Sequence, residues 1–166
     1  METEWLDRTE REAWLRLVAV VELLPGVLDA QLRTEAGLTH FEYFVLAMLS
    51  EAPQRTLRMT SLALRTNATL PRLSHVVRRL EDRGLADRLP CPEDGRATNA
   101  RLTDAGWAAV AAAAPGHVAT VRRTVLDPLS REQLTQLRGI ADSLLTRLDP
   151  EGRMTSLYEP DRVQTG

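Results

Sequence analysis

The amino-acid sequence predicts a mainly α-helical protein that carries one small β-hairpin. Apolar residues recur at three- and four-residue spacing along most of the chain, which is typical of helices with one buried face. After Gly84 the spacing changes, because Leu85, Asp87 and Leu89 alternate with Ala86 and Arg88, and a turn-rich run follows from Pro90 to Gly95. With 166 residues, 43% of them hydrophobic, the chain can form one packed lobe and an extended helical element.

The first part of the chain predicts two helices. Residues 4–36 carry an apolar stripe at helical spacing, and Pro25-Gly26 is expected to bend or break this long helix. Thr39 and Glu42 have the spacing of a capping box, in which each side chain bonds the backbone N–H of the other residue. A second helix is therefore expected to begin there and to end just before Pro53.

Two shorter helices joined by a turn are expected next. The first covers Thr56 to Arg65, and Thr66-Asn67-Ala68 forms the turn. Thr69 can cap the second helix, and Gly84 can end it. The second helix has one apolar and one basic face. The apolar face carries Leu73, Val76, Val77 and Leu80, and the other carries Arg72, Ser74, His75, Arg78 and Arg79.

The last part of the chain predicts two more helices and a tail. Thr103 is expected to cap a helix that runs into an alanine-rich stretch, and Pro115 is expected to kink or split it. His117 would then lie on the surface near the start of a helical segment. Residues 130–148 combine a capping-type start with an apolar stripe, and residues 149–166 are expected to form a tail.

The central helix pair and the hairpin together predict a winged helix-turn-helix. A helix with a basic outer face can enter the major groove of DNA, while Arg96 near the hairpin tip reaches the neighbouring minor groove. Asp94 is expected to hold the guanidinium of Arg96 in place. Arginine-rich helix faces are also common on ordinary solvated surfaces, but the adjoining hairpin favours a DNA-binding lobe over residues 37–102.

The distribution of charge supports this interpretation. The formal net charge of −2 argues against binding to nucleic acid through bulk electrostatics. Between Gln54 and Arg101, however, ten arginines face five acidic residues, which gives that part a net charge of +5. All 21 basic residues of the chain are arginine, which suits bidentate contacts to phosphate and guanine. A GC-rich genome is the preferred explanation of that bias.

Three motifs in this region resemble those of a known family. The run MTSLALRTNATLPRLSHVVRRLEDRGL is followed by the wing motif Asp94-Gly95-Arg96 and then by Leu102-Thr103-Asp104-Ala105-Gly106, which reopens a helix. In this order they resemble the MarR (multiple antibiotic resistance regulator) family of bacterial repressors. The family's helical layout fits about residues 8–148, and the stretch after Asp149 has no counterpart in it.

The resemblance implies a homodimeric transcriptional regulator, with residues 1–36 and 103–148 as a helical dimerisation region. It implies a repressor that binds a pseudo-palindromic operator in double-stranded DNA and releases it when a small molecule, aromatic or phenolic, occupies a cleft. Candidate DNA contacts are Arg58, Thr60, Ser61, Thr69, Arg72, Ser74, His75, Arg78, Arg79, Asp94, Gly95 and Arg96. Candidate ligand-binding residues are Trp14, His40, Phe41, Tyr43, Phe44 and Trp107, although aromatic residues on such helices more often belong to the core.

The sequence contains no pattern typical of an enzyme, a metal site or a membrane protein. Its three histidines lie on different elements, and it has neither a phosphate-binding glycine loop nor a nucleophile elbow. We therefore expect a cytoplasmic protein without cofactor, metal or membrane contact. Two alternatives stay open. Cys91 could act as an oxidant sensor, since Arg88 and Arg96 lie near it, or the winged helix could dock protein partners instead of DNA.

Overall fold

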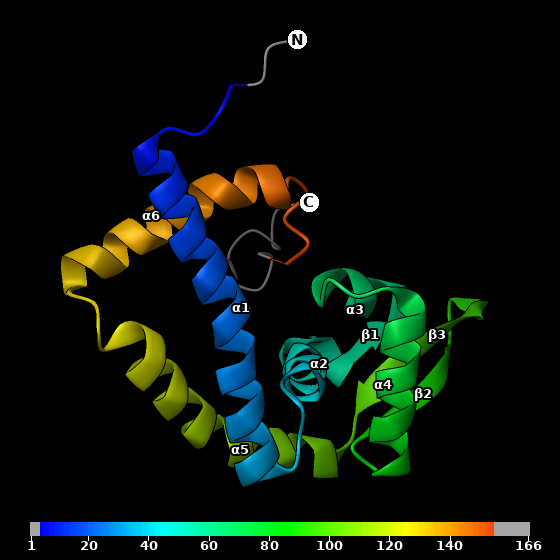
Figure 1. The fold of residues 1–166 in the computed structure, drawn as a ribbon. Helices are drawn as coiled ribbons and strands as arrows, with labels where there is room; N and C mark the ends of the chain where they lie inside the picture. The colour runs from blue at the N-terminus through cyan, green and yellow to red at the C-terminus, as the bar shows by residue number, and fades with distance from the viewer. Residues whose placement is uncertain (1–3, 155–166) are drawn as a thin grey trace.

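The computed structural model describes residues 4–154 and shows a mainly helical protein with a small sheet (Figure 1). This confirms the predicted fold class. The helices are α1 (Arg8–Ala36), α2 (His40–Glu51), α3 (Met59–Arg65), α4 (Leu70–Asp82), α5 (Asp104–Val121) and α6 (Arg131–Leu148), with a 3-10 turn η1 (Pro53–Arg55) and a π-helical turn η2 (Arg122–Leu126). The strands are β1 (Thr56–Arg58), β2 (Ala86–Cys91) and β3 (Asp94–Leu102).

The sheet is antiparallel and has three strands in the order β1-β3-β2. The prediction that Thr56 to Arg65 is one helix is therefore wrong in its first three residues, which form β1 and pair with Asn99 to Arg101 of β3. Three residues are too few for periodicity to separate strand from helix, and the pairing partner lies some forty positions further along the chain. The hairpin turn is also shorter than expected, because Cys91 already pairs with Asp94.

Neither proline in a long helix ends that helix. α1 runs through Pro25 as the one long helix that was expected, and α5 runs through Pro115, so of the expected alternatives the break and the split do not occur. An internal proline costs about 3 kcal/mol, mainly because one backbone hydrogen bond is missing and the ring clashes with the preceding turn. α1 and α5 contact each other, and both prolines lie exposed on the outside of their helices. α1 ends at Gly37, which takes the left-handed conformation with φ of 63°.

The buried core lies in a lobe formed by α2, α3, α4 and the sheet, on one side of α1 in Figure 1. α1 adds only Leu28 and Leu32 to the buried set, and α6 has no buried residue. Both helices instead expose large apolar side chains. These include Trp14, Leu15, Val20, Val21 and Leu23 on α1 and Leu137, Ile140, Leu144 and Leu148 on α6.

The base of the hairpin is fastened to the start of α5. The Thr103 hydroxyl donates to the carbonyl of Gly84 at 2.7 Å and accepts from the N–H of Gly106, as expected for the cap of this helix. A Cβ atom at position 106 would lie 2.0 Å from the carbonyl oxygen of Leu85. Only glycine therefore lets α5 approach the hairpin this closely.

The chain after α6 turns back on itself. The Asp149 carboxylate accepts the backbone N–H groups of Arg153 and Met154. The rest of the predicted tail, residues 155–166, lies outside the described residues. No helix within residues 4–154 combines the length and the apolar character needed to span a bilayer.

Candidate nucleic-acid interface

Helix α4 is bounded and oriented as its sequence predicts. The Thr69 hydroxyl accepts the N–H of Arg72 at 3.4 Å, and Pro71 occupies the first turn, where its missing N–H breaks no helical bond. Leu73, Val76, Val77 and Leu80 are all buried, as expected. The face opposite them, which includes His75 and Arg78, is exposed.

A groove of about 200 Å³ separates α4 from the hairpin wing. It brings together four of the predicted contact residues, Arg58, Thr60, Ser74 and Arg96. It also contains Arg88, which the sequence analysis did not select as a site residue. Its place on the first strand of the predicted hairpin is the signal that could have found it.

The arginines of this groove differ in their partners. Arg88 pairs with Glu81 of α4, with 2.6 Å between Nε and Oε2. Arg58 lies 3.9 Å from Asp94 across the wing. Within residues 4–154 neither the guanidinium of Arg96 in the groove nor that of Arg78 on the exposed face of α4 forms an ion pair. These two cations therefore contribute the least compensated positive charge on this side of the lobe.

Asp94 acts on the wing backbone and not on the head of the wing arginine. One of its carboxylate oxygens accepts the backbone N–H of Arg96 at 3.1 Å, and the other faces Arg58. The expectation that Asp94 holds the Arg96 guanidinium is therefore corrected, since the turn geometry places the backbone N–H within its reach. Gly95 has open space around its Cα.

The opposite flank of α4 faces α2. The guanidinium of Arg72 lies over the ring of Phe41, 4.2 Å from its centroid. Arg79 forms an ion pair of 2.7 Å with Glu42, and Arg83 lies 3.9 Å from the same carboxylate. Of the five residues predicted on the basic face of α4, two thus contact the neighbouring helix.

Cys91 lies at the end of β2, where its side chain is only 6% exposed. Its sulfur lies 3.5 Å from Nη2 of Arg58. This hydrogen bond lowers the pKa of the Cys91 thiol below its usual value, with help from the backbone N–H of Glu93. The contact with Arg58 therefore favours the thiolate form of Cys91, whereas burial limits the access of solvent to its sulfur.

The six candidate ligand residues do not gather in one place. Trp14 is exposed on α1, about 33 Å along the helix axis from its end near α2. Trp107 lies on the surface beneath the guanidinium of Arg55, which is 4.5 Å from its ring. Phe44 packs against the core of the lobe, and the Phe41 ring lies under the guanidinium of Arg72.

The remaining two candidates, His40 and Tyr43, meet His117 of α5. The His40 and His117 rings stack with centroids 6.2 Å apart, and Tyr43 lies 4.7 Å from His117. His117 was expected on the surface, but it is half-buried because α5 continues through Pro115 and turns the residue toward α2. Its Nδ1 is buried and has no hydrogen-bond partner within residues 4–154. Burial lowers the pKa of both histidines and raises that of Tyr43.

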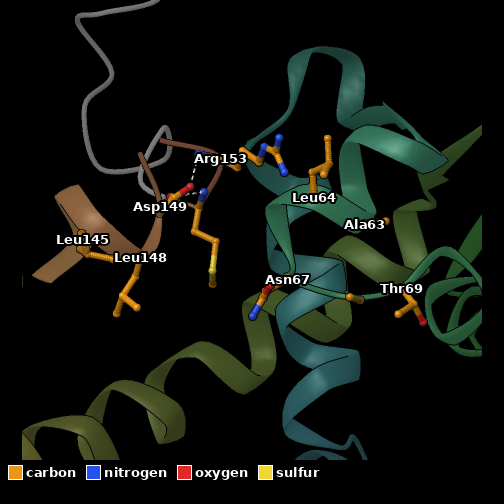
Figure 2. A pocket seen from close by; sticks show the side chains of 10 residues that line it. Ala63, Leu64, Asn67, Thr69, Leu145, Leu148, Asp149 and Arg153 are labelled. Carbon is orange, nitrogen blue, oxygen red and sulfur yellow. Dashed lines mark hydrogen bonds between the residues drawn. The ribbon is translucent and has the colours of Figure 1, made fainter. Parts of the chain in front are cut away.

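A larger cavity of about 590 Å³ lies between the helix-turn-helix and the end of α6. Figure 2 shows Leu145, Leu148 and Asp149 on one side of it, facing Asn67 and Thr69 on the other. The cavity could not be predicted from the sequence, because its two walls are separated by more than seventy positions in the chain. It adjoins the cap of α4.

The fold and the groove define a winged helix-turn-helix protein with a basic recognition side, and comparison with known proteins identifies the family. Residues 36–97 match the sequence model of the MarR family. Sco3205, a MarR family transcriptional regulator from Streptomyces coelicolor whose crystal structure contains DNA, is 42% identical. That match has a TM-score of 0.86 and covers 90% of this chain and 93% of Sco3205.

Two further solved structures agree. AbsC, a MarR family transcriptional regulator from the same organism, is 38% identical with a TM-score of 0.81, and the match covers 91% of this chain and 99% of AbsC. A probable transcriptional regulator from Pseudomonas aeruginosa is 28% identical with a TM-score of 0.66, over 75% of this chain and 93% of that one. Comparison with curated proteins gives no match.

The chain therefore belongs to the MarR family of transcriptional regulators. This confirms the resemblance inferred from the wing motif and the Leu-Thr-x-x-Gly motif that follows it. Membership of a family of regulators also agrees with the expectation that the chain is not an enzyme.

Proposed function

We propose that the protein is a homodimeric repressor that binds a pseudo-palindromic operator in double-stranded DNA. The observation that carries this proposal is the groove between α4 and the wing, which collects Arg58, Arg88 and Arg96 beside Ser74. Arginines placed along a helix and an adjoining hairpin can follow the phosphate backbone and reach base edges. The presence of DNA in the crystal structure of Sco3205, at 42% identity, supports the same function.

In this proposal α4 enters the major groove with its exposed face, from Thr69 through His75 and Arg78. Arg96 reaches the flanking minor groove, where narrow A·T tracts concentrate negative potential. Thr60, Ser61 and Arg58 approach the phosphates from α3 and β1. Affinity then comes mainly from phosphate contacts, and sequence preference comes from α4.

The exposed apolar side chains of α1 and α6 support a dimer. Trp14, Val20 and Leu23 on α1 and Ile140 and Leu148 on α6 are all more than half exposed. A soluble monomer rarely leaves so much apolar surface uncovered. We propose that residues 1–36 and 103–148 bury it against a second copy and set the two α4 helices about 34 Å apart, one turn of DNA.

We further propose that a small aromatic or phenolic effector releases the DNA. The half-buried rings of His40, Tyr43 and His117 join α2 of the lobe to α5 of the helical region. A ring-shaped ligand that separated them would change how the lobe sits on α5. Nδ1 of His117, which lacks a hydrogen-bond partner among residues 4–154, could bond a phenol hydroxyl.

Oxidation of Cys91 is a competing release mechanism. The contact with Arg58 favours it, because a change at the sulfur would move an arginine of the groove. The burial of the sulfur opposes it, since an oxidant must first reach the thiolate.

Fluorescence anisotropy tests the proposed function. A duplex selected by the protein from a randomised pool is compared with a scrambled duplex at several salt concentrations. Arg96→Ala should weaken binding to both duplexes and reduce the salt slope by about one for each phosphate that the variant no longer neutralises. Arg11→Ala, on α1 far from the lobe, is the matched control. A protein that selects no duplex would refute DNA binding and favour a protein-docking module.

A further inference from the structure

Two successive residues in the first turn of α2 each contact an arginine of α4. The ring of Phe41 lies under the guanidinium of Arg72, with 4.2 Å between the guanidinium carbon and the ring centroid. The carboxylate of Glu42 pairs with Arg79 at 2.7 Å. The first turn of α2 therefore contacts the flank of α4 that lies between its buried and exposed faces.

These two contacts leave their arginines in different states. The Glu42 side chain is 2% exposed, so Arg79 directs its N–H donors into the lobe. The guanidinium carbon of Arg72 lies over the Phe41 ring, a cation–π contact that uses no hydrogen-bond acceptor. The N–H donors of Arg72 therefore remain available for a bidentate bond.

Both ends of the Arg72 residue are fixed. Its backbone N–H donates to the Thr69 hydroxyl in the first turn of α4. The Phe41 ring is fixed as well, because it is partly buried against the core of the lobe. Arg72 itself remains exposed and forms no ion pair within residues 4–154. A long flexible side chain is thus held on a rigid platform without losing its hydrogen-bonding capacity.

We propose that Phe41 is a specificity-determining positioning residue, whose ring holds the Arg72 guanidinium in place to bond a guanine edge in the operator. The inference rests on the proposed function, because it needs a DNA-binding α4. It assigns to α2, a helix outside the groove, a part in choosing the operator sequence. Arg72 makes the base contact, and Phe41 acts only through Arg72.

The size of the effect follows from the geometry. A cation–π contact at an exposed site contributes about 0.5–1 kcal/mol, which corresponds to about two- to fivefold in affinity. If both half-sites of a dimer are affected, Phe41→Leu should weaken operator binding by about four- to twenty-fivefold. Binding to the scrambled duplex should change little, so the ratio of the two affinities should fall by nearly the same factor.

The test is a double-mutant cycle in the full-length protein, with the selected duplex and the scrambled duplex as probes. Phe41→Leu, Arg72→Ala and the double variant are compared by anisotropy, with thermal unfolding measured for each. Phe41→Tyr keeps the ring and is the matched control, expected to bind like the unmodified protein. In the Arg72→Ala background, Phe41→Leu should have no further effect on the affinity ratio.

Two results would overturn the inference. One is a loss of operator affinity on Phe41→Leu that is equally large with and without Arg72, since the ring would then act through packing alone. The other is an unchanged affinity ratio in both Phe41→Leu and Arg72→Ala while the unmodified protein still prefers its selected duplex. If the unmodified protein shows no preference for any duplex, the proposed function fails together with this inference, which distinguishes that case from the other two.

Discussion

Replacing either partner of the Glu42–Arg79 ion pair should destabilise the lobe, but by unequal amounts. The Glu42 side chain is 2% exposed, whereas that of Arg79 is 49% exposed. Arg79→Met removes the cation and leaves a buried carboxylate whose remaining basic neighbour, Arg83, is 3.9 Å away. A buried charge that loses its partner costs about 3–5 kcal/mol, and the nearby Arg83 brings the expected loss toward about 3 kcal/mol.

The reverse change should be milder. Glu42→Gln keeps an acceptor for the N–H of Thr39, so the capping box that starts α2 survives. It leaves a guanidinium that can turn toward water, and we expect a loss of about 1 kcal/mol in the free energy of unfolding. Met retains much of the apolar stem of Arg79, so the comparison isolates charge.

Urea unfolding followed by circular dichroism measures both variants at one protomer concentration, because dimerisation would couple stability to concentration. The double variant Glu42→Gln/Arg79→Met should lose less stability than Arg79→Met alone, since no buried charge remains. The reasoning would be refuted if Glu42→Gln cost as much as Arg79→Met, or if the double variant were less stable than both single variants.

Three further predictions test other parts of the structure. Gly106→Ala should cost about 1–3 kcal/mol in unfolding free energy because of its backbone clash, whereas Gly139→Ala, in open space on α6, should stabilise by up to about 1 kcal/mol; equal urea midpoints would contradict this. Burial lowers the pKa of His40 and His117, so the unfolded chain binds more protons than the folded chain below about pH 6.5. The free energy of unfolding should therefore decrease as the pH is lowered through this range. In urea unfolding at several pH values, a His40→Gln/His117→Gln variant should show a weaker dependence of its unfolding free energy on pH. An unchanged pH dependence would contradict this prediction. Cys91→Ser should leave DNA affinity and its response to peroxide unchanged, and anisotropy showing that peroxide releases only the unmodified protein would favour the redox mechanism.

The features that sequence predicted well are local ones. The capping box at Thr39 and Glu42, the cap at Thr69 and the start of α6 at Ser130 all occur as expected, because each depends on residues only three positions apart. The same holds for the left-handed glycine at Gly84, with φ of 69°. The buried face of α4 was predictable because thirteen residues give periodicity enough repeats to be decisive.

The features that sequence did not predict depend on distant partners. β1 is a strand because its residues pair with β3, which lies far along the chain. α5 continues through Pro115 instead of splitting, and the α1 residues that it contacts lie some eighty positions earlier in the chain. His117 was misplaced for the same reason, since a continuous α5 turns it toward α2 and a split helix would not.

The basic face of α4 shows how this limit affects the functional site. A helical projection separates apolar from polar positions. It does not show which of the polar positions are in contact with neighbouring helices or strands. In the structure one flank lines the groove beside the wing through Ser74, and the other contacts α2 through Arg72 and Arg79. Only the strip between them, with His75 and Arg78, faces outward without a neighbour in the lobe. The number of arginines on a recognition helix therefore overstates the number available to DNA, and the residues of α2 decide which of the flanking ones remain available.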